Sequence, residues 1–236
     1  TSRHGQSSRG QSMQFHLNGF APGDPDNHRA HVAQALPSTV DVLIVGAGPA
    51  GLTLAAQLAA FPGLTLRVVE QKHGPLLVGQ ADGIACRSME MFQAFGFAER
   101  VAREAYWVNE TCFWRPAPDE PGRIARARVI QDVEDGLSEF PHVILNQARV
   151  HDHYLEILRN AASPVTPDYA RRLVELSRDD HPTHPLLAVL ETSDPRLPQA
   201  SHTLRARYVV GCDGARSAVR SALGLVLEGD AANQAW

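Results

Sequence analysis

Three glycines and one acid in the first third of the chain have the types and spacing needed to hold a dinucleotide. Gly46, Gly48 and Gly51 form the pattern G-x-G-x-x-G, and Glu70 follows them. Glycine at these positions permits a tight turn, close approach of the backbone to a pyrophosphate, and close packing of a helix on a strand. Glu70 can accept hydrogen bonds from ribose hydroxyls and would repel a 2′-phosphate, so the tightly held dinucleotide should not be NADP.

The sequence on both sides of the glycines predicts the strands and the helix that must position these residues. An apolar strand is expected at 40–45, and an amphipathic helix at 49–60 follows the glycines and begins with Pro49 and Ala50. Its N-terminus would offer free N–H groups and a positive dipole end to phosphates. A second strand at 64–70 ends on the acid. Strand, helix and acid together favour a ligand site over a glycine-rich turn without a ligand.

A second group of residues at 207–220 could also do chemistry. A strand runs into Gly-Cys-Asp-Gly, and a helix is expected near Ser217. Asp213 would then lie at the carboxyl end of a parallel strand, where ligands of open α/β sheets gather. Its carboxylate could bind a ribityl hydroxyl or orient a water beside a phosphate, and the competing interpretation is a turn residue or a helix cap. Its position downstream of a G-x-G-x-x-G unit favours the ligand role.

The rest of the pattern predicts an α/β fold with an antiparallel excursion. Residues 106–115 and 124–132 are β-branched or aromatic runs that predict a hairpin. Residues 71–86 form a long loop. Further helices are expected at about 87–95, 98–105 and 148–161, and an antiparallel meander of strands at about 171–178, 186–192 and 202–210.

The composition of the chain argues against some classes of binding partner. The net charge of −4 and the absence of a basic tract argue against nucleic acid, and no apolar run is long enough to cross a bilayer. The three cysteines are widely spaced without a C-x-x-C pair, which indicates neither a disulfide framework nor a metal site. We therefore expect a cytoplasmic protein without a membrane or nucleic-acid partner.

These motifs carry a family resemblance. Together with GQADGIACRSMEMFQAFG at 79–96, HVILNQ at 142–147 and YVVGCDGARSAVR at 208–220, they resemble the single-component FAD-dependent aromatic hydroxylases of the phenol 2-monooxygenase branch, from about residue 40 onward. The resemblance implies a Rossmann-like FAD-binding domain of the p-hydroxybenzoate hydroxylase type, with an antiparallel β excursion towards a substrate domain. It implies a homodimer that holds FAD and uses NADPH as a transient co-substrate. O2 would add at the flavin C4a carbon, and the outer oxygen of the hydroperoxide would pass to phenol or a 3-hydroxybenzoate-like compound.

The resemblance also assigns roles to individual residues. Asp82 and His142 are expected near the flavin ring and the aromatic substrate, where a carboxylate or imidazole can assist loss of the phenol proton. The competing interpretations are an Asp-Gly turn for Asp82, and a polar residue satisfying backbone after a proline for His142. The cofactor-binding set implied by the resemblance is Gly46, Gly48, Pro49, Ala50 and Gly51 at the pyrophosphate, Glu70 at the ribose, Gln71 near the adenine, Arg87 at the phosphates, Gln147 at the ribityl chain, and Asp213 serving FAD and the passing NADPH.

The expected domain division places an N-terminal extension at 1–38 and a hairpin contributing to the substrate domain at 106–139. The FAD-binding domain would comprise 39–105, 140–164 and 165–236, with a β-meander at 170–205. Gly229-Asp230 imitates a third fingerprint of the family but follows Asp213 too closely, so we expect a loop there. The remaining substrate domain and a C-terminal domain are expected to be absent from this chain.

Two other functions stay open on the sequence alone. An NAD-dependent dehydrogenase is compatible with Glu70, but the Asp-Gly motif and the ADGIACR loop are not expected there. A flavin-free protein of the same superfamily, escorting lipidated partners, is expected to show a degraded glycine pattern, whereas this pattern is intact. Arg87, finally, could be no more than a first-turn residue of an exposed helix.

Overall fold

The computed structural model describes residues 23, 24, 27, 36–79, 81–120, 122–196, 198–230 and 232. The chain forms two compact units, of which the first contains Leu77–Val150 and the second contains Asp24–Leu76 together with His151–Trp236. The cut points between these units differ from the expected domain boundaries, and that division stays a prediction.

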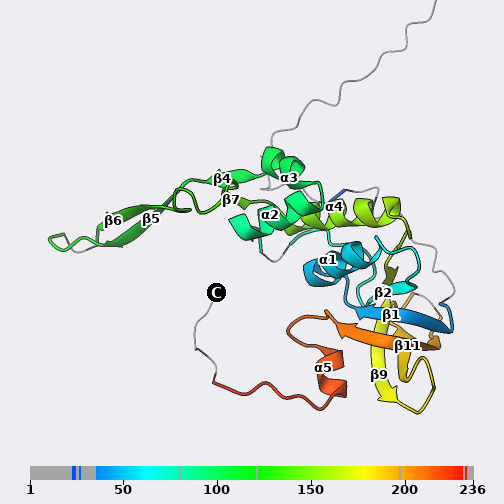
Figure 1. Ribbon diagram of the computed structural model, residues 1–236. Helices are drawn as coiled ribbons and strands as arrows, with labels where there is room; N and C mark the ends of the chain where they lie inside the picture. The colour runs from blue at the N-terminus through cyan, green and yellow to red at the C-terminus, as the bar shows by residue number, and fades with distance from the viewer. Residues whose placement is uncertain are drawn as a thin grey trace, which may run out of the picture. The chain divides into compact units, whose positions relative to one another are not determined.

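The second unit is built on a six-stranded sheet in the order β8-β2-β1-β11-β10-β9 (Figure 1). Strands β8, β2, β1 and β11 run parallel, and β10 and β9 continue the sheet antiparallel. The expected meander and the parallel strand before Asp213 are both confirmed. The strands are β1 Thr39–Val45, β2 Leu66–Glu70, β8 Asp168–Tyr169, β9 Arg171–Arg178, β10 Leu186–Thr192 and β11 Ser201–Gly211.

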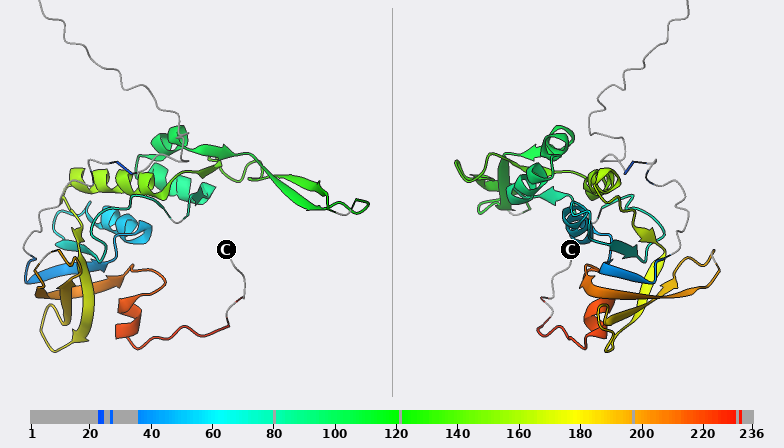
Figure 2. Two further views of the ribbon diagram at one scale, coloured as in Figure 1. Left: turned by 180° about the vertical axis from the view of Figure 1, so that it is seen from behind. Right: turned by 45° about the vertical axis from the view of Figure 1, so that its right-hand side comes forward.

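Helices cover both faces of this sheet. Helix α1, Pro49–Leu58, lies on one face, and the short α5, Ala218–Ala222, lies on the other (Figures 1 and 2). Because side chains alternate along a strand, Leu43 and Val45 of β1 join a buried cluster with Val219 of α5, while Ile44 is buried on the opposite face. This double burial explains why the sequence of β1 is continuously apolar.

The described part of the first unit contains α2, α3, the start of α4 and two small sheets. A three-stranded sheet has the order β3-β7-β4, and β5 pairs with β6 as an antiparallel hairpin. The run expected as one strand at 106–115 is divided at Asn109, because β4 pairs with β7 and β5 pairs with β6. The elements are β3 Gly83–Ile84, α2 Cys86–Ala94, α3 Ala98–Glu104, β4 Tyr106–Val108, β5 Glu110–Pro116, β6 Ile124–Gln131 and β7 His142–Ile144.

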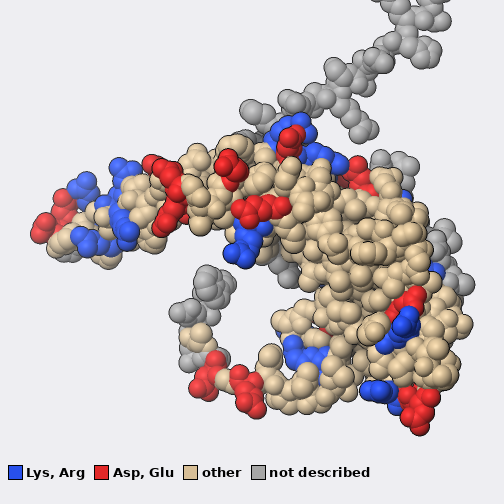
Figure 3. Space-filling model, in the orientation of Figure 1, with Lys and Arg blue, Asp and Glu red and all other residues tan. Residues whose placement is uncertain are grey.

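The hairpin is exposed on both faces and carries charged side chains of both signs (Figure 3). Helix α4, Gln147–Asn160, begins in the first unit and ends in the second. Gly229 and Asp230 lie outside any helix or strand, as expected for a loop. Within the described ranges, every helix is too short or too polar to cross a membrane.

Candidate functional site

The glycine turn between β1 and α1 has two glycines that the protein itself requires. Gly46 has a φ of +104°, in the left-handed region, and a Cβ added there would collide with the carbonyl oxygen of Cys212. A Cβ added at Gly51 would collide with the carbonyl oxygen of Gly46. The turn can therefore form only with glycine at both positions.

Gly48 is different. Its φ is −73°, which any residue can adopt, and a Cβ added there would meet no described atom within 4 Å. Gly48 is the N-cap of α1, and no side chain caps this helix end, which starts with Pro49. The positive end of the α1 dipole is thus flanked by bare backbone and open space. This arrangement is the one that a pyrophosphate needs.

Glu70 at the end of β2 is directed towards this turn. Its Oε2 accepts a hydrogen bond from the Ala47 N–H at 2.9 Å, and its Oε1 accepts one from the Lys72 N–H at 2.8 Å. Among the described residues it makes no salt bridge. A half-buried carboxylate with these two contacts keeps lone pairs free to accept bonds from ribose hydroxyls.

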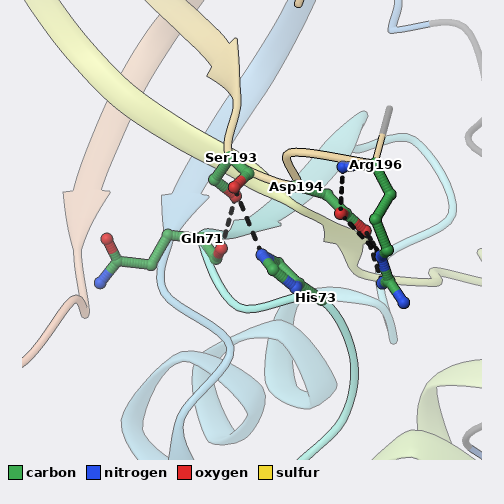
Figure 4. Close-up of polar contacts among 5 residues, drawn as sticks. All are labelled: Gln71, His73, Ser193, Asp194 and Arg196. Carbon is green, nitrogen blue, oxygen red and sulfur yellow. Dashed lines mark hydrogen bonds and ion pairs between the residues drawn. The ribbon is translucent and has the colours of Figure 1, made fainter. Parts of the chain in front are cut away.

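Hydrogen bonds to Ser193, which follows β10, and to Ala170, which lies between β8 and β9, fix the chain after Glu70. The Ser193 hydroxyl donates to the Gln71 carbonyl at 2.6 Å, and the His73 Nε2 lies 3.3 Å from the Ser193 carbonyl oxygen. The Ala170 N–H donates to the Lys72 carbonyl at 2.8 Å. Figure 4 shows that the Gln71 side chain points away from these contacts. Its backbone is therefore held in place while its amide is left for other partners.

Asp213 at the end of β11 caps α5. Its Oδ2 accepts bonds from the Ala218 N–H at 2.6 Å and the Val219 N–H at 3.2 Å, and its Oδ1 accepts one from the Ser217 hydroxyl at 2.6 Å. The competing interpretation of Asp213 as a helix cap thus describes contacts that the structure contains. A role towards the cofactor stays a prediction. Burial, and after it the charge of Asp213, raises the pKa of the Cys212 thiol, which disfavours a reactive thiolate.

In the first unit, the two predicted catalytic residues lie at neighbouring strands. Strand β3 pairs with β7, and the Leu145 N–H donates to the Asp82 carbonyl at 2.9 Å. A Cβ added at Gly83 would lie 3.4 Å from the His142 Nε2. The Asp82–Gly83 segment therefore runs beside the imidazole of His142, which places both predicted residues at one small sheet.

The imidazole of His142 has a carboxylate partner that sequence reasoning missed. Its Nδ1 lies 2.8 Å from Oδ2 of Asp132, and the Thr111 hydroxyl donates to Oδ1 of Asp132 at 2.9 Å. Burial raises the pKa of Asp132, but the hydrogen bonds from His142 and Thr111 outweigh it and hold the pKa below its ordinary value. Asp132 follows the hairpin in sequence, and nothing in the local pattern marks it.

Gln147 and Arg87 complete the predicted set in this unit. Gln147 is the first residue of α4, and a Cβ added at Gly79 would collide with its Cβ, so the loop and the helix start are in close contact. The side chain of Asn146 accepts bonds from the Gly79 N–H at 3.0 Å and the Ala148 N–H at 2.9 Å. Arg87 is exposed in the first turn of α2 and forms no ion pair with a described residue.

The predicted residues thus fall into two sets, one in each unit. The second unit brings together parallel strands, a glycine turn, an uncapped helix N-terminus and an acid after the next strand. That combination defines a Rossmann-like dinucleotide-binding domain. The first unit holds Asp82, Arg87, His142 and Gln147, and the second holds Gly46, Gly48, Pro49, Ala50, Gly51, Glu70, Gln71 and Asp213.

Sequence comparison then gives the particular family. The profile of the FAD-binding domain family matches residues 39–236, and the chain belongs to this family. The chain is 60% identical over 231 residues to a 3-hydroxybenzoate 4-monooxygenase from Comamonas testosteroni, covering 95% of this chain and 36% of the relative. It is 33% identical over 199 residues to a phenol 2-monooxygenase from Aspergillus fumigatus, covering 84% of this chain and 32% of the relative.

A solved structure agrees with these relatives. The flavin-dependent monooxygenase PieE, in complex with FAD and substrate, superposes with a TM-score of 0.68 at 27% identity, covering 83% of this chain and 34% of that protein. The chain therefore spans about a third of the length of the relatives that it matches. These comparisons confirm the predicted family, the p-hydroxybenzoate hydroxylase type of fold, and FAD as the cofactor.

Proposed function

We propose that this chain holds FAD in an NADPH-dependent monooxygenase that uses O2 to hydroxylate a phenolic compound. The observation that supports the proposal most directly is the open, backbone-lined bend at Gly48 with the Glu70 carboxylate bonded across it. A flavin-free protein has no need to keep that space clear. The 60% identity to a 3-hydroxybenzoate 4-monooxygenase makes 3-hydroxybenzoate the first substrate to test.

We assign residues of each unit to the cofactor. In the second unit, we assign the pyrophosphate to the turn from Gly46 to Gly51, the adenosine ribose to Glu70 and the adenine side to Gln71. Asp213 would serve FAD and NADPH from the neighbouring strand end. In the first unit, Arg87 would approach the phosphates and Gln147 the ribityl chain. When bound, the flavin accepts hydride from NADPH and activates O2.

His142 and Asp82 would act on the substrate. A phenol ring is a better nucleophile when its hydroxyl has lost a proton, and a positioned imidazole can accept that proton. In this step the phenol O–H bond breaks and a bond from the proton to Nε2 of His142 forms. Asp82, on the segment beside His142, would orient the phenol. The surrounding protein must also exclude water, because activated oxygen otherwise decays to hydrogen peroxide.

The wider proposal concerns assembly and location. We propose a cytoplasmic homodimer that works on small phenolic compounds, without nucleic-acid or membrane partners. The support is the family resemblance and the composition. Analytical ultracentrifugation of the full-length protein measures its oligomeric state directly.

The central experiment is a visible absorption spectrum of the full-length protein as purified. Flavin bands are expected, and NADPH should bleach them faster when 3-hydroxybenzoate or phenol is present. Mass spectrometry of the aerobic reaction should then detect a phenol that has gained one oxygen atom. A colourless protein, or NADPH oxidation that no phenol accelerates and that yields no hydroxylated product, would overturn the proposal.

A further inference from the structure

We infer that Asp132, held by Thr111, is a positioning residue that fixes the ring of His142 in the tautomer and orientation needed to accept the phenol proton. The inference rests on the proposed function and adds to it two residues, neither of which is part of a recognisable sequence motif. Both come from the base of the hairpin formed by β5 and β6.

The three side chains form a continuous chain of hydrogen bonds. Thr111 donates to one carboxylate oxygen of Asp132 at 2.9 Å, and the other carboxylate oxygen lies 2.8 Å from Nδ1 of His142. The side chains of His142 and Asp132 are only 31% and 18% exposed. Partial burial reduces competition from water, so this contact fixes the ring more firmly than a surface contact could.

The chemistry of the carboxylate decides the tautomer. An ionised carboxylate only accepts hydrogen bonds, so the Nδ1 facing Asp132 must carry the proton. In the neutral ring, Nε2 is then left as the acceptor. The positive charge that forms when Nε2 takes a proton is stabilised by the carboxylate on the other side of the ring.

The surroundings of Nε2 suit a proton acceptor. The neighbouring residue on the β3 side is Gly83, and even an added Cβ would stay 3.4 Å from Nε2. Gly83 is exposed and has no side chain. On the Gly83 side, therefore, backbone without a side chain borders the acceptor nitrogen, and Asp82 is the preceding residue.

The hairpin base does not need the second carboxylate oxygen for its own closure. The Asp132 N–H donates to the Asn109 carbonyl at 3.0 Å, and Thr111 binds Oδ1. These two contacts already join the end of β6 to the start of β5. The bond between Oδ2 and His142 is additional, and it links the hairpin base to the first residue of β7. Figure 1 shows the hairpin and β7 as ribbons.

The test is a double-mutant cycle in the full-length, FAD-containing protein with 3-hydroxybenzoate as the probe. The variants are Asp132→Asn, His142→Ala and the double substitution, with Glu134→Gln as an exposed acid-to-amide control close by. The dissociation constant of 3-hydroxybenzoate comes from the change that it causes in the flavin spectrum. The values of kcat and KM come from the rate of NADPH oxidation that is coupled to formation of the hydroxylated product. Thermal unfolding is recorded for every variant.

Asp132→Asn should lower kcat by at least about tenfold, because an amide no longer enforces the tautomer. The same substitution should have no further effect when His142 is already alanine, because there is no ring to position. Thr111→Val, which leaves the carboxylate in place, should show a smaller loss of the same kind. Glu134→Gln should behave as the unmodified protein does.

Three results separate the inference from its alternatives. An equal loss from Asp132→Asn with and without His142, accompanied by a lower melting temperature, would make Asp132 a structural clasp of the hairpin. An unchanged Asp132→Asn beside an impaired His142→Ala would also overturn the inference while leaving the proposed function intact. Failure of the proposed function itself would appear in the unmodified protein, as a flavin spectrum and NADPH oxidation that do not respond to any phenol.

Discussion

The carbonyl oxygen of Cys212 lies directly against Gly46, where any side chain would collide with it. The Cys212 N–H donates to the Val45 carbonyl at 2.7 Å, and the Cα of Asp213 would be 2.9 Å from a Cβ on residue 46. The turn after β1 and the turn after β11 thus pack backbone against backbone. Two motifs that are far apart in the sequence are therefore in direct contact. Substitutions at the individual glycines of the first turn can separate folding from cofactor binding.

Gly48→Val should abolish retention of FAD while the protein stays folded. An added Cβ meets no described protein atom within 4 Å, but the valine side chain would occupy the space assigned to the pyrophosphate. The measurement is flavin absorbance per polypeptide after purification, together with circular dichroism. Flavin content equal to that of the unmodified protein would show that the pyrophosphate is bound elsewhere.

Gly51→Ala is the matched comparison, because its methyl group would collide with the Gly46 carbonyl. We expect destabilisation of roughly 3 kcal/mol or more from this overpacking, with loss of folded protein rather than loss of flavin alone. Thermal unfolding of both variants separates the two effects. A Gly51→Ala protein as stable as the parent would contradict the geometry of the turn.

Gly79→Ala should weaken FAD binding through Gln147. A Cβ at position 79 would collide with the Cβ of Gln147 and lie 2.9 Å from its backbone nitrogen, so the loop or the start of α4 has to move. The readout is the FAD dissociation constant by fluorescence titration of deflavinated protein. Gly74→Ala serves as the control, because a Cβ there meets no described atom within 4 Å. Equal affinities of the two variants would remove Gln147 from the cofactor site.

Asp213→Ala and Ser217→Ala should differ in their effect on FAD. Both side chains cap α5, since Ser217 accepts from the Arg220 N–H at 3.0 Å and Asp213 accepts from the Ala218 and Val219 N–H groups. Each substitution should cost about 1 kcal/mol of stability through the lost cap. Only Asp213→Ala should weaken FAD binding, by about tenfold or more if a charged hydrogen bond is lost. Indistinguishable FAD affinities would leave Asp213 a helix cap alone.

Asp41 makes part of the stability of the sheet depend on pH. Hydrogen bonds from the side chain and backbone of Thr65, and after them the contact with Arg207, lower the pKa of Asp41 from 3.8 to about 2. Because the folded-state pKa is depressed, this contribution is fully present above 3.8 and is lost as the pH falls towards 2.

Asp41→Asn should therefore lower the free energy of unfolding at neutral pH, and the difference from the parent should shrink as the pH falls through that window. Urea unfolding at a series of pH values measures it, with Asp180→Asn at an exposed position as the control. A difference that stays constant with pH would show that the carboxylate charge contributes nothing.

The sequence predicts the strand–helix–strand unit well because its signals are local. The apolar run of β1, the glycines and the helix start at Pro49 all lie within one short stretch, and each confirms the others. The two-residue strands β3 and β8 were not predicted, since so few residues carry no periodic pattern. The division of 106–115 at Asn109 was missed for another reason: the two halves pair with different partner strands.

In the candidate site, too, the sequence predicts local features but not contacts that depend on the tertiary fold. The positions of Gly46, Gly48 and Gly51 follow from a motif with a known geometry. The contacts of Asp132 do not, because a hydrogen bond between the end of a hairpin and a later strand depends on the tertiary fold. The cap formed by Asn146 had a local signal, an asparagine immediately before a helix, that could have been used.

Among Gly46, Gly48 and Gly51 of the first turn, Gly48 alone has no described protein atom within 4 Å of an added Cβ. Packing within the chain itself requires glycine at residues 46 and 51, whereas the proposed nucleotide would be the reason for glycine at residue 48. A descendant that abandoned redox chemistry would accumulate larger side chains at position 48 first, with its neighbours unaltered. We therefore expect a larger side chain at position 48 in related chains that no longer bind flavin.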